Sequence, residues 1–298
     1  MSAAPTVGFI GFGEAGSHIA SGLRSAGVDR LFAFDIQADS REFGPRIHAR
    51  AEASQTVFAS SPAALAESSA ILFSTVTASA ALDAARAIAP FLGGRHLYAD
   101  LNSVSPALKQ AIAEEIGASG AGFVEAAVMS PVPPYLHRAP MLLGGSAAPR
   151  FAEIFRPLGM RLEVIGPGIG AAAAIKMCRS VVVKGLEALL VECALAADRY
   201  GADARVFASL DESFPGLDWK KLADYMISRV VLHGERRAHE MDEVAETLRA
   251  IGIDPIMAEA AARRQRATAE LGLRSRFGPE GPKTYRDFLD ALGALPSD

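Results

Sequence analysis

The sequence predicts a doubly wound α/β domain over residues 1–166, followed by an all-helical domain over residues 167–298. Up to about Gly166, short apolar runs alternate with helical patterns, which is the rhythm of βαβ units in a parallel sheet. A glycine-rich stretch, 166–170, then indicates a hinge, and only helical patterns follow it. A chain of 298 residues is long enough for two ordinary domains.

Eight apolar runs are expected to form the strands of the sheet. In chain order they are Val7–Ile10, Arg30–Phe34, Thr56–Ala59, Ala70–Ser74, His96–Ala99, Gly122–Val128, Pro140–Leu143 and Arg161–Ile165. Ser61-Pro62 and Ser105-Pro106 indicate helix starts, because serine caps a first turn and proline fits its first position. In the second domain, one long helix is expected from Ala171 to about Tyr200, and an amphipathic one from Glu240 to Ala250.

The most informative motif follows the first expected strand. Gly11, Gly13 and Gly16 have the Gly-x-Gly-x-x-Gly spacing, between an apolar run and a helical pattern. The first glycine allows a tight turn, the second lets backbone N–H groups approach a pyrophosphate, and the third lets the helix pack against the strand. The helix amino terminus then favours the anion. The predicted dinucleotide-binding loop of a Rossmann domain consists of Gly11, Phe12, Gly13, Glu14, Ala15 and Gly16.

Further cofactor contacts are expected at the carboxyl ends of neighbouring strands, where doubly wound sheets bind ligands. Asp35 ends the second strand, where its carboxylate can accept hydrogen bonds from a ribose diol. The same rule selects Ser74, Thr75, Val76, Asn102 and Ser103. Asp35 favours NAD, because its charge would repel the 2′-phosphate of NADP, although NADP stays open because Arg41 is close in sequence.

Composition argues against several classes of protein. The formal net charge is −4 and neither sign forms long runs, which disfavours a nucleic-acid-binding protein. Residues 1–6 lack a basic region followed by an apolar stretch, so no export signal is expected. Cys178 and Cys193 share one expected helix, about 20 Å apart, which is too far for a disulfide and favours the cytoplasm. No histidine, cysteine and carboxylate spacing indicates a metal site.

Polar residues share one face of the long helix. Lys176, Ser180, Lys184 and Glu187 fall within an arc of about 80°, with Arg179 on its edge. One interpretation is a solvated face. The other is a small-molecule cleft at the hinge, in which partial desolvation lowers the pKa of Lys176 and lets it act as a base. The charges on this helix would be costly in lipid, so no membrane span is expected.

These residues together resemble the β-hydroxyacid dehydrogenases of the 6-phosphogluconate dehydrogenase-like superfamily. Val7–Gly16 matches the family's glycine motif, and Gly166–Ser180 resembles its hinge and catalytic-lysine motif, with Lys176 at the lysine. Asp100–Pro106 is similar to the family's Asp-x-Ser-Thr-x-x-Pro segment, in which Asn102 and Ser103 replace the Ser-Thr pair.

The chain departs from the family where substrate is expected. Glu125–Pro131 replaces the family's Asp-Ala-Pro-Val-Ser-Gly-Gly, which removes a carboxylate cradle, and Ser180 replaces an asparagine. Prolines make Met129–His137 a stiff, apolar wall instead. His239-Glu240 falls where the family has Lys-Asp near cofactor and substrate. The chain looks like the phosphogluconate-dehydrogenase-like branch with its own carboxyl-terminal helical domain. The expected substrate contacts are Asn102, Ser103, Met129, Ser130, His137, Ser180 and His239, of which Asn102 and His239 are also expected to contact the cofactor.

The resemblance implies hydride transfer between nicotinamide and a substrate carbinol, with Lys176 as general acid and base. Two other classes stay open: a redox-neutral lyase or isomerase in which tightly bound NAD oxidises the substrate transiently, and a non-catalytic dinucleotide-binding module. The expected partners are a small-molecule substrate and a second copy of the chain. A homodimer through the helical domain is expected because helix 171–197 is more apolar than so short a domain can cover.

Overall fold

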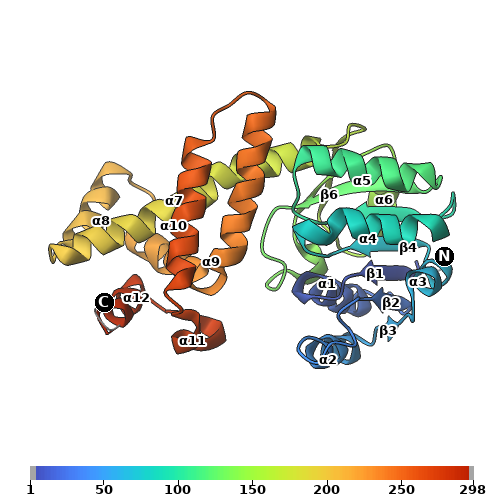
Figure 1. The fold of residues 1–298 in the computed structure, drawn as a ribbon, viewed down its shortest axis with the longest axis horizontal. Coiled ribbons are helices and arrows are strands. Elements are labelled where there is room, and N and C mark those ends of the chain that lie inside the picture. The colour runs from blue at the N-terminus through green and yellow to red at the C-terminus, as the bar shows by residue number, and fades with distance from the viewer. Residues whose placement is uncertain (1–4, 295–298) are drawn as a thin grey trace. The chain divides into compact units, whose positions relative to one another are not determined.

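A computed structural model describes residues 5–294 and divides the chain into two compact units (Figure 1). Unit 1 runs up to Lys176 and holds the sheet, and unit 2 begins at Met177 and is helical throughout its described part. The predicted absence of an export signal rests partly on residues 1–4, which lie outside the described residues.

All eight predicted strands are confirmed, each to within about two residues at its ends. They form one sheet in the order β3-β2-β1-β4-β5-β6-β7-β8. Their bounds are β1 Val7–Ile10, β2 Leu31–Phe34, β3 Val57–Phe58, β4 Ile71–Ser74, β5 Leu97–Asp100, β6 Gly122–Val128, β7 Met141–Gly144 and β8 Leu162–Gly166. The chain winds outward from β1 in both directions, so the topological switch point lies between β1 and β4.

The predicted doubly wound sheet is confirmed, and it is parallel except at one pair of strands. β7 runs antiparallel to β6, with Ala126 opposite Leu143, whereas the other neighbouring strands pair in parallel. A parallel pair needs a crossover of about a dozen residues or more, usually a helix. The connection from β6 to β7 contains only the short 3-10 helix η3, Leu136–Arg138, so the chain returns directly along the edge of β6.

Helices cover both faces of the sheet. Their bounds in unit 1 are α1 Glu14–Ser25, α2 Gly44–Ser54, α3 Pro62–Ser68, α4 Ala81–Ile88, α5 Pro106–Ala118 and α6 Ala148–Phe155, with the 3-10 helices η1 Ala78–Ala80 and η2 Ala89–Phe91. Both predicted serine caps are confirmed, since Ser61 accepts from the Ala64 N–H and Ser105 from the Leu108 N–H.

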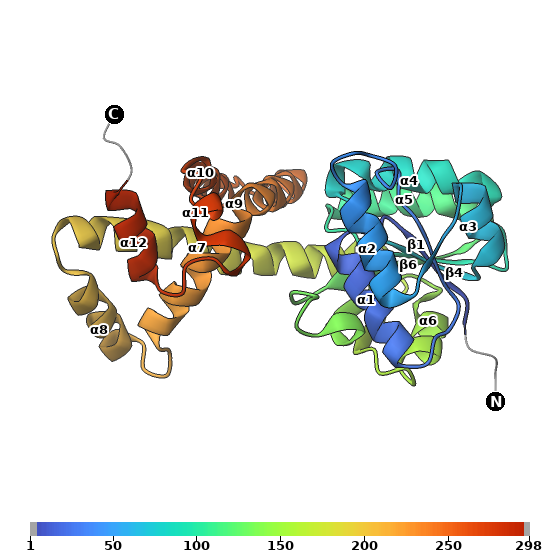
Figure 2. The same ribbon diagram turned by 90° about the horizontal axis from the view of Figure 1, so that it is seen from below.

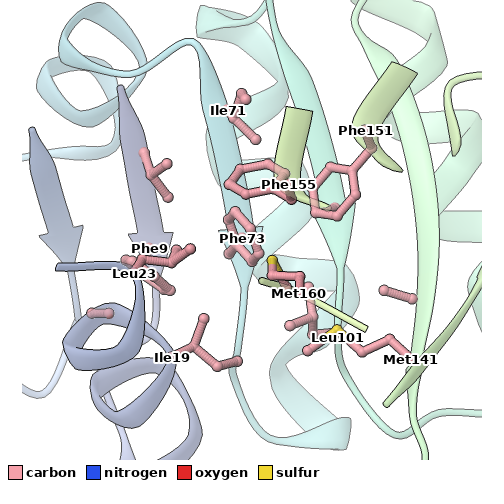
Figure 3. Packing of buried hydrophobic residues seen from close by; sticks show 14 of the residues in the cluster. Phe9, Ile19, Leu23, Ile71, Phe73, Leu101, Met141, Phe151, Phe155 and Met160 are labelled. Carbon is pink, nitrogen blue, oxygen red and sulfur yellow. The ribbon is translucent and has the colours of Figure 1, made fainter. Parts of the chain in front are cut away.

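The core of unit 1 has two layers. Against one face of the sheet, helices α1, α2 and α6 bury an aromatic cluster in which Phe73 packs on Phe9 and Phe155, with ring centroids 5.4 and 5.2 Å away (Figure 3). Against the other face, helices α3, α4 and α5 bury a second cluster that includes Leu72 and Tyr98. Because the central strands β1, β4 and β5 are packed on both sides, the loops at their carboxyl ends leave from fixed positions.

Unit 2 is built around the long helix α7, Ala171–Arg199, whose predicted extent is confirmed. The other helices are α8 Asp203–Ser213, α9 Trp219–Ala250, α10 Ile256–Glu270, α11 Arg274–Phe277 and α12 Tyr285–Gly293, with the 3-10 helix η4 Gly278–Glu280. The predicted helix from Glu240 to Ala250 is the last third of α9, which kinks at His233 (φ −135°, ψ 16°). Within residues 5–294, every helix falls short of the length and apolarity that a membrane crossing needs.

Candidate functional site

The glycine loop joins β1 to α1, and two of its glycines are required by close contacts. Gly11 has a left-handed φ of +79°, and a Cβ there would lie 2.6 Å from Val76 Cγ1. A Cβ on Gly16 would lie 2.6 Å from Thr75 Oγ1, so α1 starts directly against the loop that follows β4. Around Gly13, in contrast, no atom of residues 5–294 beyond its immediate chain neighbours lies within 4 Å of where a Cβ would be. The loop therefore leaves open space at its middle glycine.

The start of α1 offers backbone N–H groups beside this space. Gly13 is the N-cap residue, and no side chain of the described residues 5–294 caps the helix there. First-turn N–H groups have no partner inside their helix, so they can donate to an anion. Glu14 is exposed and Ala15 half-buried, but the Phe12 side chain is fully buried against Phe9. Phe12 therefore belongs to the core through its ring, and only its backbone lies in the loop.

Asp35 follows β2 and ties that strand end to the glycine loop. Its Oδ2 accepts a hydrogen bond from the Phe12 N–H at 2.7 Å, and its Oδ1 accepts one from the Gln37 N–H at 2.8 Å. A carboxylate has about four acceptor positions, so both oxygens keep room for a further donor. Asp35 holds the loop and can still accept hydrogen bonds from the hydroxyls of a ligand.

A buried network fixes the ends of β4 and β5. Asp100 forms an ion pair with Lys109, in which Lys109 Nζ lies 3.0 Å from Asp100 Oδ2. Asp100 Oδ1 accepts a hydrogen bond from the Asn102 backbone N–H at 3.0 Å. The Asn102 side chain donates to Ser74 Oγ at 2.8 Å and accepts the Val76 N–H at 2.8 Å. Two predicted site residues, Ser74 and Asn102, are thus buried, and their hydrogen bonds link the loops after β4 and β5.

Lys176 and Ser103 meet in unit 1, although 73 positions separate them in the sequence. Lys176 Nζ donates a hydrogen bond to Ser103 Oγ, and both residues are half-buried. Ser103 leaves the carboxyl end of β5, on the same edge of the sheet as the loops after β1 and β4. The structure therefore brings the predicted catalytic lysine to a predicted substrate residue.

Glu125, in the middle of β6, is a functional candidate that sequence reasoning missed. Its fully buried carboxylate accepts the Gly170 N–H at 2.7 Å through Oε2 and the Ala173 N–H at 2.6 Å through Oε1. It therefore caps the amino terminus of α7, where the helix dipole favours a negative charge. Gly144 makes the room, since a Cβ there would lie 2.7 Å from Oε2. Lys176 follows Ala173 by three residues, so Glu125 fixes the turn that precedes it. The signal in the sequence was an acidic residue inside an otherwise apolar strand.

The two ends of the segment Met129–His137, which was predicted to form a stiff, apolar wall, have different surroundings. Met129 and Ser130 are half-buried at the end of β6, which runs parallel to β5, so they leave the same edge as Ser103. His137, at the far end, is 3% exposed, and its Nε2 lies 2.9 Å from the Leu158 carbonyl oxygen. Burial lowers the pKa of His137. Its ring packs against α1 at Gly22, so its surroundings give it a packing role, and the substrate contact predicted for it stays a prediction.

Further along α7, the polar stripe is not a solvated face. Ser180, Lys184 and Glu187 are 7%, 8% and 2% exposed. Lys184 Nζ lies 2.6 Å from Glu240 Oε2, and Glu187 Oε1 lies 2.7 Å from Arg237 Nη1. Burial raises the pKa of Glu187 to about 7 and lowers that of Lys184. The stripe therefore continues as a buried ionic cluster inside unit 2.

His239 and Glu240 stand where the family resemblance places a Lys-Asp pair, and the two side chains have different surroundings. The His239 side chain is 69% exposed, with Nδ1 3.8 Å from Asp242 Oδ2. The Glu240 side chain is 19% exposed and pairs with Lys184. Glu240 is thus the member of the pair that joins the ionic cluster, and the contacts predicted for His239 stay predictions.

The edge of unit 1 has the features that a dinucleotide requires. Open space at Gly13 lies beside the uncapped start of α1, and Asp35 keeps acceptor capacity at the end of β2. Residues 6–166 match the family model described as the NAD binding domain of 6-phosphogluconate dehydrogenase.

The chain belongs to this family. Its cofactor is NAD or NADP, because the matched family binds NAD and the geometry of the glycine loop fits a dinucleotide. Residues 197–268 of unit 2 match a second model, a domain of unknown function (DUF1932). The expected branch of the superfamily, with its own helical domain, is thereby confirmed.

Two solved structures and one curated protein place the chain among its relatives. A conserved hypothetical protein from Sinorhizobium meliloti 1021 is 38% identical, with a TM-score of 0.75 over 98% of this chain and 96% of that one. A conserved protein of unknown function, described as similar in structure to 3-hydroxyacid dehydrogenases, is 33% identical, with a TM-score of 0.70 over 90% of this chain and 98% of that one. The mitochondrial 3-hydroxyisobutyrate dehydrogenase of Drosophila melanogaster is 29% identical over 72% of this chain and 65% of its own length. These relatives support an NAD(P)-dependent oxidoreductase.

Proposed function

We propose that the chain is an NAD(P)-dependent dehydrogenase or reductase of the β-hydroxyacid dehydrogenase type. The observation that carries this proposal is the hydrogen bond from Lys176 Nζ to Ser103 Oγ, at the sheet edge that also bears the glycine loop. A lysine held at this edge is a proton donor when charged and a base when neutral. The similarity to a 3-hydroxyisobutyrate dehydrogenase supports the same reaction class.

The chain's own residues manage one proton in this reaction. The cofactor, when bound, accepts the hydride in oxidation and supplies it in reduction. In oxidation the carbinol loses its C–H and O–H bonds and becomes a carbonyl, and neutral Lys176 accepts the hydroxyl proton at Nζ. In reduction Lys176 returns that proton to the carbonyl oxygen. Ser103 Oγ accepts a hydrogen bond from Nζ and so orients the amine, while Glu125 fixes the first turn of α7.

The substrate is a small molecule with a carbinol, and we propose a hydroxyacid-like compound or a bulkier alcohol. The segment after β6 reads Met129-Ser130-Pro131 where a typical family member has a cradle of Ser-Gly-Gly amides. Proline has no N–H to donate, so this loop recognises a carboxylate less well than the family's loop.

A panel of alcohols and hydroxyacids tests the reaction, with NADH and NADPH formation followed by absorbance and products by mass spectrometry. Stoichiometric reduced cofactor and a carbonyl product support the proposal. A product formed without net reduced cofactor would instead assign a redox-neutral lyase or isomerase. Cofactor binding without any product would favour a binding module.

Replacement of Asp35 by alanine is expected to raise the Kd for NAD by about tenfold or more, and the Kd for NADP by less. The carboxylate accepts from the ribose diol in NAD, whereas it repels the 2′-phosphate of NADP, so only NAD loses a favourable contact. Isothermal titration calorimetry with each cofactor measures both constants.

The matched control for this prediction is Asp39→Ala, because Asp39 is an exposed acid in the same connection. Its NAD affinity is expected to stay at the wild-type value. Asp35→Asn adds a second comparison, because it keeps one acceptor for the Phe12 N–H and so preserves the loop. Equal loss of NAD and NADP in Asp35→Ala and none in Asp35→Asn would mean that the residue only supports the loop.

We also propose a homodimer that covers α7. Val182 and Leu189 on this helix are 70% and 55% exposed, and two turns apart, so they share one apolar stripe. Sedimentation velocity is expected to give a dimer for the wild type and a monomer for the Val182→Glu, Leu189→Glu double variant. Phe91→Glu, at a 47% exposed position in unit 1, is the control and is expected to remain a dimer. A monomeric wild type would refute this proposal.

A cytoplasmic location is proposed on the state of the cysteines. Cys178 and Cys193 are both free thiols, and burial raises the pKa of Cys193, which disfavours its reactive thiolate form. Cell fractionation of the tagged chain, with alkylation of free thiols before lysis, is expected to recover a fully alkylated protein in the cytosolic fraction.

A further inference from the structure

Cations gather in unit 2 where α9 kinks. Arg229, His233 and Arg236 follow one another at spacings of four and three residues, so they share one face of α9. Arg237 is the next residue, and Arg274 begins α11, which lies beside α9 (Figure 2). The pKa of His233 is lowered to about 4, mainly because the ring is buried and also because these four arginines carry positive charge nearby. We call Arg229, Arg236, Arg237 and Arg274 the arginine cluster.

The acidic residues near the arginine cluster do not neutralise it. Arg237 pairs with Glu187 at 2.7 Å, and Arg236 pairs with Glu240 at 2.8 Å. Glu240 also pairs with Lys184, so one carboxylate serves two cations. Arg229 and Arg274 form no ion pair or side-chain hydrogen bond with any residue between 5 and 294. Positive charge therefore exceeds negative charge at this place.

Two N–H donors of the cluster are buried without an acceptor among residues 5–294. Arg237 is 8% exposed, and although its Nη1 reaches Glu187, its Nε has no hydrogen-bond partner in this part of the chain. Arg229 is half-buried, and its Nε is likewise buried and unpartnered within the described residues. Burial lowers the pKa of Arg229, and the charge of Arg237 lowers it further. Buried N–H donors of charged groups are costly to leave unsatisfied, which favours an acceptor beside these guanidinium groups.

The kink fixes the backbone that carries these side chains. His233 has non-helical dihedral angles, and at Gly234 a Cβ would lie 2.8 Å from the Gln265 carbonyl oxygen. The glycine thus lets α10 approach α9 at the kink itself. Close packing of the two helices holds the part of α9 that carries Arg229, Arg236 and Arg237 in place without any ligand.

We propose that the arginine cluster is a binding site for a small oxyanion, in which Arg229 and Arg274 supply the charge for a carboxylate or phosphate group. A guanidinium presents its N–H donors in a planar fork that matches the paired oxygens of both groups. The site is built from residues of unit 2 alone and does not rest on the proposed dehydrogenase function.

Calorimetric titration of the full chain with inorganic phosphate, and separately with malonate, tests the site. The protein is first saturated with NAD, so that the glycine loop does not contribute, and ionic strength is held constant with sodium chloride. Arg229→Gln and Arg274→Gln are each compared with Arg205→Gln, which removes the same charge from an exposed position on α8. Arg274 is itself exposed, so its variant is expected to fold normally even if Arg229→Gln is destabilised.

Saturable binding of either anion is expected, with a Kd that rises about tenfold or more in Arg229→Gln and Arg274→Gln and stays unchanged in Arg205→Gln. Tighter binding of phosphate than of malonate assigns a phosphate ligand, and the reverse assigns a carboxylate. The proposal is overturned if neither anion binds saturably, or if all three variants bind like the wild type. It also fails if Arg205→Gln weakens binding as much as the other two, since the effect is then general charge screening.

Discussion

Replacement of Lys176 by alanine is expected to lower kcat by about 10²- to 10⁴-fold, which is the usual contribution of a general acid or base. The residue accepts or donates the only proton that the proposed reaction exchanges with the chain. The glycine loop and Asp35 are built without the lysine side chain, so NAD affinity is expected to stay within about twofold of the wild type. Steady-state kinetics on the substrate found in the panel, together with calorimetric NAD titration, measures both quantities.

The control for this prediction is Lys220→Ala, because Lys220 is an exposed lysine at the start of α9. Its kcat is expected to equal that of the wild type. Ser103→Ala should cost less, about tenfold, because it removes the hydrogen bond that orients Nζ but leaves the amine. A Lys176→Ala enzyme that turns over at the wild-type rate would remove the lysine from the mechanism.

The central strands of the sheet could be predicted in detail because they are buried on both faces. Such strands appear in the sequence as short continuous apolar runs. The edge strands β3 and β8 are more exposed, and they were located as shorter or mixed apolar runs at the ends of the same series. The direction of β7 could not be read in the same way. A buried strand has the same composition in either direction, and the short connection through η3 decides that β7 runs antiparallel to β6.

The extent of α9 was hidden for a different reason. Its apolar period is interrupted at His233, where the helix kinks, and the segment before that point faces helices α8 and α12 while the segment after it faces α10. In the sequence, a regular amphipathic pattern is therefore visible only in the last part of α9, from Glu240 to Ala250.

In the candidate site, the residues found from the sequence are those with a local signal. The glycine spacing, Asp35 and the lysine after the hinge each stand in a recognisable segment. The contacts that hold them join distant segments. Ser103 was itself predicted, but its hydrogen bond with Lys176 spans 73 positions, and Glu125, which was missed, lies 45 and 48 positions from the two amides it caps. Contacts of this kind depend on the order of the strands, which no single segment encodes.

Replacement of Glu125 by alanine is expected to lower the free energy of unfolding of unit 1 by about 2–4 kcal/mol. Two buried N–H groups, those of Gly170 and Ala173, would lose their acceptor, and the amino terminus of α7 would lose its cap. Glu125→Gln should fall between alanine and the wild type, since its amide oxygen replaces one acceptor while its NH₂ group faces the second N–H. Urea unfolding followed by circular dichroism measures the change.

The same variants separate a structural role from a role in positioning Lys176. The kinetics are measured without urea, at a temperature where Glu125→Gln is fully folded. If the first turn of α7 is displaced in this variant, Nζ of Lys176 moves away from Ser103. In that case kcat should fall several-fold, while the Kd for NAD stays near the wild-type value. Glu163→Gln is the matched control, because Glu163 is an exposed acid on β8 of the same sheet. A folded Glu125→Gln protein with wild-type kcat would show that the cap contributes stability alone, and that Lys176 is held by its contacts with Ser103 and the rest of α7.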